Sequence, residues 1–230
     1  MHLNTKATTD NLAKSNYDDV IIATGVNPRQ LKLEGSNHPK VLSYLDVLKD
    51  KVKVGKSVAI IGAGGIGFDV AEYLSHSGES TALNTKEFLK EWGVDVNYEK
   101  GGALMEPVFE ESPRKIFLLQ RSKGKVGAGL GKTTGWIHRS ALKKKHVQMV
   151  KNVQYQKIDD QGLHITIGDK TDVLEVENIV VCAGQVSFKD LFEPLKAKGI
   201  NVHLIGGADV AAGLDAKRAI DQGSRLAAEI

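Results

Sequence analysis

The chain has 230 residues, of which 41% are apolar and 26% charged, and its formal net charge is +3. This length suits one large domain or two small ones, and the mild charge argues against nucleic acid as a partner. No apolar run approaches the roughly 20 residues that span a bilayer, and the polar N-terminus does not resemble a signal peptide, so we expect a cytoplasmic protein with no membrane partner. The single cysteine, Cys182, excludes an intramolecular disulfide and a cysteine-ligated cluster built by this chain alone.

The first half of the chain predicts an alternation of buried strands and short helices. In chain order we expect a strand at 17–25, a break at 26–29, a helix at 44–49, a strand at 54–61, and helices at 66–76 and 88–92. The second half continues with a strand at 116–120, a helix at 134–145, a strand at 147–150 and a hairpin formed by 153–158 and 163–167. Strands at 179–184 and 202–209 and a helix at 215–229 follow. This order of βαβ units, interrupted once, predicts an α/β fold.

The strongest local signal is the glycine pattern Gly62-Ala-Gly64-Gly65-Ile-Gly67, between the strand at 54–61 and the helix at 66–76. In a dinucleotide-binding strand–turn–helix, the first glycine allows a tight turn and the second lets the backbone approach a pyrophosphate. The third lets helix and strand pack closely, and the helix N-terminus favours anions. A lone pattern of this kind is weak evidence, but here its context is right.

Three further strands end in small residues, which leave room for a flat ligand at the carboxyl edge of a parallel sheet. They end in Thr24-Gly25, in Ala183-Gly184 and in Gly207-Ala-Asp209. Three such ends around one glycine pattern suggest two nucleotide ligands. The alternative is that these residues only terminate the strands.

Two other patterns carry no function. Residues 127–133 resemble a phosphate-binding Walker loop, but the first required glycine is replaced by Val126, so we reject ATP binding. The run Lys143-Lys144-Lys145 is more typical of the solvated end of a helix than of a binding patch. The histidines are scattered, and no metal-ligand or Ser/His/Asp spacing stands out.

Taken in order, these segments resemble the flavoprotein reductases that bind two dinucleotides. Within that group the chain is similar to the C-terminal portion of bacterial NADPH-dependent 2,4-dienoyl-CoA reductases, enzymes of fatty-acid β-oxidation. The segments that carry the resemblance, besides the strand ends and the glycine pattern, are residues 129–139, 155–164 and 215–220. The resemblance runs across essentially the whole chain and implies a Rossmann-like NADPH domain with an incomplete second, FAD-type domain.

The departures from that family bear on completeness. Its members join an FMN-bearing barrel, an iron–sulfur cluster and an FAD/NADPH module, whereas this chain has neither the length nor the cysteines for the first two. It also lacks the first glycine pattern, which would hold the FAD pyrophosphate. The resemblance therefore implies a fragment whose missing partner is the barrel domain. Its expected parts are an FAD-domain segment at 1–54, an NADPH domain at 55–184 and a C-terminal FAD-domain segment at 185–230.

The preferred nicotinamide cofactor is predicted from the end of the strand at 116–120. An NAD-binding fold usually places an acid there to hold the ribose 2′-hydroxyl, but this strand is followed by Arg121-Ser122-Lys123. A guanidinium with a hydroxyl and an ammonium beside it suits a 2′-phosphate. We therefore expect NADPH rather than NADH, with Arg121 as the main discriminator; the alternative is an ordinary surface arginine.

The resemblance also implies roles for single residues. Asp209 follows the pattern of the acid that hydrogen-bonds a flavin ribityl hydroxyl; the alternative is a cap of the following turn. Glu72 is expected on the first turns of its helix, where it would orient the nicotinamide carboxamide, or else form an i,i+4 surface pair. A lid at 127–133 would bring Trp136, His138 and Arg139 near the cofactor, unless Trp136 is core and the other two are surface residues.

The expected cofactor contacts form two sets. NADPH would be held by Gly62, Gly64, Gly65, Gly67, Glu72, Arg121, Ser122, Lys123, Ala183 and Gly184, and FAD by Thr24, Gly25, Gly207 and Asp209. No side chain is expected to be catalytic, because hydride passes directly from nicotinamide to flavin. The alternatives are a stand-alone NAD(P)H-dependent flavoprotein reductase that feeds a partner and a noncatalytic nucleotide-binding module.

Overall fold

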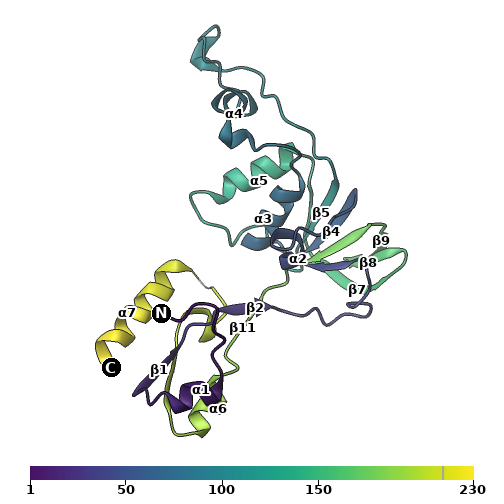
Figure 1. Ribbon diagram of the computed structural model, residues 1–230. Helices are drawn as coiled ribbons and strands as arrows, with labels where there is room; N and C mark the ends of the chain where they lie inside the picture. The colour runs from purple at the N-terminus through teal and green to yellow at the C-terminus, as the bar shows by residue number, and fades with distance from the viewer. Residues whose placement is uncertain (214) are drawn as a thin grey trace. The chain divides into compact units, whose positions relative to one another are not determined.

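The computed structural model describes residues 1–213 and 215–230 (Figure 1). The chain divides into two compact units. Unit 1 combines Met1–Arg29 with Gly184–Ile230, and unit 2 comprises Gln30–Ala183. Each sheet draws its strands from one unit only, so the two units can be described separately.

Unit 2 is built on a five-stranded parallel sheet, which confirms the predicted α/β class. In spatial order its strands are β3 (Val41–Ser43), β10 (Asn178–Val181), β4 (Ser57–Ile61), β5 (Lys115–Leu119) and β6 (Gln148–Val150). The central strand β4 carries the glycine pattern at its carboxyl end. From β4 the chain winds outward through β5 and β6, whereas β10 and β3 lie on the other side.

Both faces of this sheet are buried, which explains why its strands are continuous apolar runs. Side chains alternate between the faces: Val58 and Ile60 belong to one core cluster, and Ala59 and Ile61 to the other. The first cluster is completed by side chains from three helices. These are α2 (Tyr44–Leu48), α3 (Gly65–Leu74) and α5 (Gly135–Lys144).

The second face is covered by an antiparallel three-stranded sheet rather than by helices. Its strands are β7 (Val153–Asp159), β8 (Gly162–Ile167) and β9 (Lys170–Leu174). Fully buried Val153 and Leu163 from this sheet pack in the same cluster as Leu119 of β5. Unit 2 therefore has three layers, namely helices, parallel sheet and antiparallel sheet.

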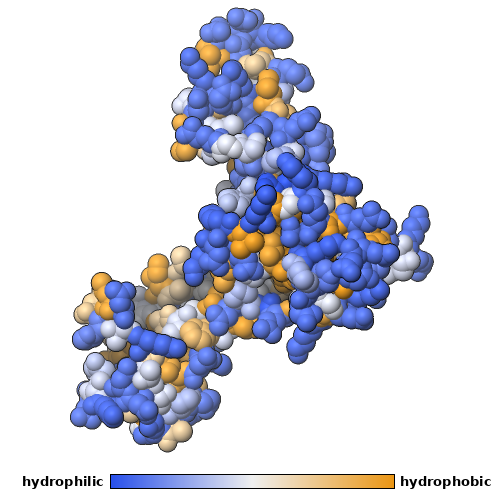
Figure 2. Space-filling model, turned by 45° about the vertical axis from the view of Figure 1, so that its right-hand side comes forward, coloured by the Kyte–Doolittle hydropathy of each residue, from blue (hydrophilic) through white to orange (hydrophobic). Residues whose placement is uncertain are grey.

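A long insertion, residues 77–113, separates α3 from β5. It contains η1 (Thr81–Leu83), α4 (Thr85–Glu91) and η2 (Gly101–Ala103). Figure 2 shows apolar patches among hydrophilic residues on this upper part of the molecule. Its exposed apolar side chains are Leu83, Phe88, Val96, Tyr98, Leu104 and Val108.

Unit 1 contains two short two-stranded sheets. One pairs β1 (Asp19–Ile22) with β12 (Asn201–Leu204) in parallel, and the other pairs β2 (Val26–Pro28) with β11 (Gln185–Ser187) antiparallel. The remaining elements are α1 (Thr9–Lys14), α6 (Phe192–Ala197), η3 (Gly206–Ala208) and α7 (Ala216–Glu229). A small core of Val20, Ile22, Leu195 and Ala208 holds it together.

Several elements differ from the sequence prediction. Residues 26–28 form β2 rather than a break, because they pair with β11, which is remote in sequence and gives no local signal. The elements α1, β3, β9, β11 and α6 were not predicted, since they are short and show little apolar periodicity; β9, for example, is exposed at its first three positions. The strand predicted at 202–209 ends at Leu204, and residues 206–208 form η3 instead, because the left-handed φ of Gly206 (+61°) ends the extended conformation. The other predicted strands and helices are present, with ends shifted by up to three residues.

The division into units also differs from the expected division at 54 and 55. Residues 30–54 belong to unit 2, because β3 pairs with β10 and α2 packs against α3. The second boundary, after Ala183, lies within one residue of the expected one.

Candidate functional site

The carboxyl ends of β4 and β10 form the switch point of the parallel sheet. Gly62 follows β4 with φ +109°, and a Cβ built there would lie 2.4 Å from the carbonyl oxygen of Cys182, which follows β10. Only glycine fits this approach of two backbones. In doubly wound sheets ligands bind in the crevice outside such a switch point.

The other glycines of the pattern serve two different purposes. A Cβ on Gly67 would lie 1.9 Å from the Gly62 carbonyl oxygen, so this glycine is required for packing of α3 against the turn. Gly64 and Gly65 have no atom within 4 Å of an added Cβ. Their exposed backbone borders open space, where a bound group can approach closely.

The N-terminus of α3 fits an anionic group. Gly64 is its N-cap residue and has no side chain that could accept a hydrogen bond from the first turn. The leading N–H groups of a helix have no partner within the helix, and the helix dipole places partial positive charge there. Helix α3 has ten residues, and its uncapped, glycine-lined N-terminus lies at the switch point. Such a helix N-terminus is suited to the pyrophosphate of a dinucleotide.

Arg121, Ser122 and Lys123 lie on the loop directly after β5, the strand next to β4. All three are exposed, and among the described residues their side chains form no hydrogen bond or ion pair. Arg121 lies near Tyr155 of β7: burial raises the pKa of that phenol, and the Arg121 guanidinium partly offsets the increase. Two free cations and a hydroxyl are therefore available at the edge where the sequence predicted them.

The predicted location of Glu72 was wrong. Because α3 begins at Gly65, Glu72 is in its last turns, about 10 Å along the axis from the helix start. Its carboxylate Oε2 lies 3.4 Å from Nδ1 of His138 on α5, so its partner is on another helix rather than at i+4. With the predicted helix at 66–76, Glu72 counts as the seventh of eleven residues, whereas in the structure it is the eighth of ten.

The acid nearer the switch point is Asp69, which the sequence analysis missed. Burial raises the pKa of Asp69, the Glu72 carboxylate raises it further, and His138 lowers it. Asp69 is also close enough to Cys182 to add to the effect of burial, which raises the pKa of that thiol to about 12. The signal that could have found it is its position two residues after Gly67, in the second turn of α3.

Ala183 and Gly184 complete the end of β10. Ala183 is partly buried against the cluster between the two sheets of unit 2. Gly184, the first residue of the second segment of unit 1, has φ +97°, and its carbonyl oxygen accepts a hydrogen bond of 3.0 Å from Arg29 N–H. Small side chains therefore do follow β10, as the sequence indicated.

Unit 1 brings its own predicted residues to the carboxyl ends of β1 and β12. The Thr24 hydroxyl donates to the carbonyl oxygen of Phe188, and Gly25, at φ +77°, accepts from Phe188 N–H at 3.0 Å. Gly207 is buried in η3, directly after β12. These contacts join the segment between β1 and β2 to the residue after β11. They leave the Gly25 surface open, since no atom lies within 4 Å of an added Cβ.

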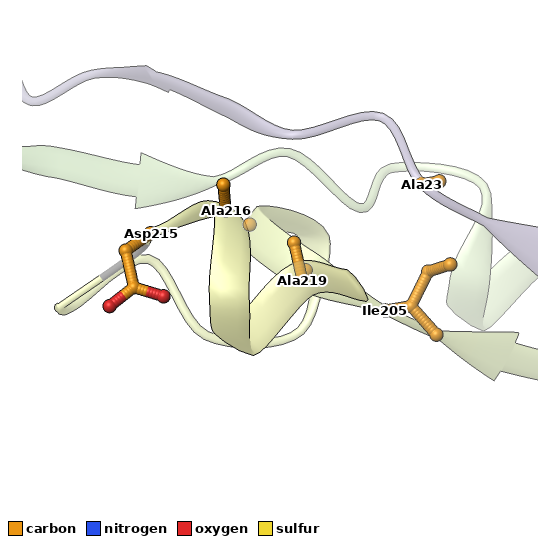
Figure 3. A pocket seen from close by; sticks show the side chains of 7 residues that line it. Ala23, Ile205, Asp215, Ala216 and Ala219 are labelled. Carbon is orange, nitrogen blue, oxygen red and sulfur yellow. The ribbon is translucent and has the colours of Figure 1, made fainter. Parts of the chain in front are cut away.

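A cavity of about 430 Å³ lies at these strand ends (Figure 3). Its lining consists of Ala23, Ile205, Gly206, Gly207, Asp215, Ala216 and Ala219. Figure 3 shows Ala216 and Ala219 on the first turns of α7, with Asp215 at its start. The Asp215 side chain accepts from Arg218 N–H at 2.8 Å and so already caps the helix. A carboxylate at this position favours a ligand that donates hydroxyl hydrogens over a phosphate.

Asp209 does not cap the following turn through its side chain. Its Oδ2 accepts a hydrogen bond of 2.7 Å from Nε2 of Gln222 on α7. The same glutamine accepts from Gly206 N–H through Oε1, also at 2.7 Å. Gln222 therefore fixes Asp209 beside the cavity, with one carboxylate edge committed to the protein.

The segment predicted as a lid is anchored at its start. Val126 and Gly127 are buried, and Nη1 of Arg139 donates to the Gly127 carbonyl oxygen at 2.9 Å. Trp136 is 57% exposed, so it is not part of the core. Any mobile lid is thereby confined to residues after Gly127.

The prediction that residues 143–145 form a solvated run was wrong for two of the three lysines. Lys145 is buried, and its Nζ donates to a ring nitrogen of His76, 2.8 Å from Nε2. Nζ of Lys144 lies 4.2 Å from the ring centroid of Trp92 and 4.3 Å from that of Phe109. Both lysines thus attach the insertion or the end of α3 to α5.

Metal-binding clusters and membrane-spanning helices are both absent from the described part of the chain. No group of three or more histidine, cysteine, aspartate or glutamate side chains there is placed to hold a metal ion. None of its helices is both long and apolar enough to cross a membrane.

Comparison with known proteins gives consistent matches. The pyridine nucleotide-disulphide oxidoreductase family matches residues 2–217. A metal reductase of Desulforamulus reducens is 26% identical over 208 residues, and a cinnamate reductase of Clostridium sporogenes is 27% identical over 207. These alignments cover 89% and 90% of this chain but 30% and 26% of those proteins.

Among solved structures, a 2-naphthoyl-CoA reductase is similar with a TM-score of 0.74 and 25% identity. The match covers 99% of this chain and 29% of that one. The chain therefore spans about a third or less of each of these relatives.

Proposed function

Because the chain belongs to the pyridine nucleotide-disulphide oxidoreductase family, we propose that it is the electron-input portion of a flavin-dependent reductase. In this proposal unit 2 binds NADPH and unit 1 binds part of FAD. The observation that carries it is the uncapped, glycine-lined N-terminus of α3 at the switch point between β4 and β10. When bound, the reduced nicotinamide supplies a hydride that the flavin accepts.

The residues of unit 2 would bind the nucleotide through three features. Backbone N–H groups at Gly64 and Gly65 would hold the pyrophosphate, and the free cations at Arg121 and Lys123 would pair with the 2′-phosphate. Small Ala183 leaves space for a flat ring at the end of β10. The remaining predicted contacts are Gly62, Gly67 and Ser122 in this unit, and Gly184, which follows Ala183 in the chain.

We assign the acid that faces the nicotinamide to Asp69 rather than to Glu72. Asp69 is in the second turn of α3 and close to Cys182 at the end of β10, whereas Glu72 is bonded to His138. A carboxylate near the strand ends could accept a hydrogen bond from a carboxamide. In this role Asp69 orients the ring and transfers no proton.

The residues of unit 1 fit a hydroxyl-bearing part of FAD better than its phosphates. Asp215 already caps α7 from the edge of the cavity, and Oδ1 of Asp209 forms no hydrogen bond with any residue that the structure describes. Carboxylates accept hydrogen bonds from the hydroxyls of a ribityl chain. Thr24, Gly25 and Gly207 would provide the backbone surface on which that chain lies.

The sequence resemblance also suggests the type of reductase. We propose a reductase like the 2,4-dienoyl-CoA reductases, of which this chain is the portion that lacks the FMN barrel and the iron–sulfur part. In support, the similar proteins are reductases, including one that acts on a CoA thioester, and the chain corresponds to less than a third of each. As an isolated piece it should bind NADPH and reduce no enoyl substrate.

Calorimetric titration with NADPH and NADH tests the cofactor assignment. The protein should bind NADPH more tightly, and Arg121→Ala should weaken NADPH binding by about tenfold or more while leaving NADH binding unchanged, because charge-assisted hydrogen bonds to phosphate are lost. Lys170→Ala is the matched control, since it removes one exposed positive charge from β9 of the same unit. Equal affinities for both cofactors would refute NADPH selectivity.

The absorption spectrum of the purified protein and the same calorimetric titrations test the two alternatives. Bound flavin that NADPH bleaches would favour a stand-alone reductase that feeds a partner. No binding of either nicotinamide cofactor would favour a noncatalytic module.

A further inference from the structure

The loop that carries Arg121, Ser122 and Lys123 is organised around one side chain. Gln120, the residue after β5, turns its amide into the loop. Its Nε2 donates to the carbonyl oxygens of Ser122 at 3.3 Å and Gly124 at 3.0 Å. Its Oε1 accepts from Gly127 N–H at 3.3 Å. One glutamine thus bonds to the beginning, middle and end of the loop.

The far end of this loop is packed against helix α3. Gly127 has φ +71°, and a Cβ there would lie 2.6 Å from the ring of Phe68, a fully buried residue of α3. Arg139 of α5 donates to the Gly127 carbonyl oxygen at 2.9 Å. The loop is therefore anchored on two helices at Gly127, and Gln120 transmits that position back toward its start.

The start of the loop is also tied to the antiparallel sheet. Asn152 N–H donates to the Ser122 carbonyl oxygen at 3.1 Å, and Val153 N–H donates to the Gln120 carbonyl oxygen at 3.0 Å. The Ser122 carbonyl oxygen is thus held by two hydrogen bonds, one from the Asn152 backbone and one from the Gln120 side chain within the loop. The side chains of Arg121 and Lys123 remain exposed and unpaired among the described residues.

We propose that Gln120 is a positioning residue that sets the selectivity of unit 2 for an adenosine 2′-phosphate. This rests on the proposed NADPH site. Long cationic side chains without protein partners gain selectivity for a phosphate only if their backbone holds them near it. Gln120 carries no charge and its amide is used within the loop, so it acts through the placement of Arg121, Ser122 and Lys123.

The test measures the affinities of the protein for adenosine 2′,5′-bisphosphate and for adenosine 5′-phosphate by calorimetry. The ratio of the two isolates the 2′-phosphate from the rest of the nucleotide. Gln120→Met keeps the approximate length of the side chain and removes its three hydrogen bonds. It should reduce the ratio by about fivefold or more while changing 5′-phosphate binding less than about twofold.

Gln156→Met is the matched control. Gln156 is an exposed glutamine of β7, and among the described residues its Nε2 bonds only to the Thr166 hydroxyl, at 3.2 Å. This variant should therefore leave both affinities unchanged. A Gln120→Met protein that folds and keeps the full ratio overturns the positioning role while the NADPH proposal stands. If the unaltered protein shows no preference for the bisphosphate, both proposals fail.

A second measurement needs no variant. In nuclear magnetic resonance spectra of the full chain, the side-chain amide of Gln120 should shift on addition of adenosine 2′,5′-bisphosphate. The chemical shift of this amide should not change on addition of adenosine 5′-phosphate. An amide that responds equally to both nucleotides contradicts the proposal, even if Gln120→Met fails to fold.

Discussion

Replacement of Gly67 by alanine should lower the stability of the protein, whereas replacement of Gly64 by alanine should lower its affinity for NADPH. A Cβ on Gly67 would lie 1.9 Å from the Gly62 carbonyl oxygen, whereas real Cβ contacts stay beyond 3.0 Å. Helix α3 would have to move by at least about 1.1 Å from the turn. The Gly62 backbone cannot move freely, because its N–H donates to the Leu119 carbonyl oxygen at 3.0 Å. Overpacking of this kind costs about 1–3 kcal/mol of unfolding free energy.

Gly64→Ala meets no such obstacle. No atom lies within 4 Å of its added Cβ, and its φ of −84° suits any residue. Alanine is a poorer N-cap than glycine, which costs about 0.5 kcal/mol. If the pyrophosphate of NADPH lies against this backbone, however, the added methyl group would occupy its space. We expect near-normal stability with a loss of NADPH affinity of more than about tenfold.

The assay combines urea unfolding with calorimetric titration of NADPH. Both tryptophans, Trp92 and Trp136, are in unit 2, so their fluorescence follows the unfolding of the unit that contains the glycines. Gly67→Ala should lower the midpoint clearly, and Gly64→Ala only slightly. Unaltered NADPH affinity in Gly64→Ala would refute the placement of the pyrophosphate, and unaltered stability in Gly67→Ala would refute the packing argument.

Two further predictions concern buried ionisable groups. Burial lowers the pKa of Lys145, so between that pKa and 10.5 the unfolded chain binds more protons than the folded one, and stability rises with pH through this window. Urea unfolding should therefore show that the free energy of unfolding of the unaltered protein increases between neutral pH and a pH just below 10.5, and that the increase is smaller in Lys145→Met. Equal increases in the two proteins would contradict the burial of the charge. Burial raises the pKa of the Cys182 thiol to about 12, so a thiol reagent should label the folded protein more than about tenfold more slowly than the urea-unfolded chain. Equal labelling rates would show that this thiol is accessible and ionises normally.

The elements that the sequence predicted well are those whose side chains are buried on both faces. The strands β4, β5 and β10 are short continuous apolar runs, and the glycine pattern after β4 follows from steric limits that only glycine satisfies. Such signals are local, because burial and φ act on each residue separately. The same holds for the free cations at Arg121 and Lys123, which are exposed and need no partner to be recognised.

The elements that the sequence failed to predict depend on partners remote in the chain. The strand β2 exists because residues 185–187 pair with it, and β3 because it pairs with β10. Lys145 looked like the solvated end of a helix, but His76, 69 positions earlier, accepts its hydrogen bond. A charge pattern predicts exposure only when no neighbour from another element covers it.

The placement of the insertion explains why a long addition is compatible with the nucleotide site. Helix α3 starts at the carboxyl end of β4 and, because the following strand β5 is parallel to β4, returns toward the opposite edge of the sheet. Residues 77–113 leave from the end of α3 and rejoin at the start of β5, so both of their attachments lie at that opposite edge.

The loops that would contact NADPH come instead from the carboxyl edge, after β4, β5 and β10. The length of the insertion therefore changes the sequence spacing between the glycine pattern and Arg121 without changing their spatial relation. Spacing counted along the chain is for this reason a poorer guide to the acid or cation after the second strand than the strand end itself.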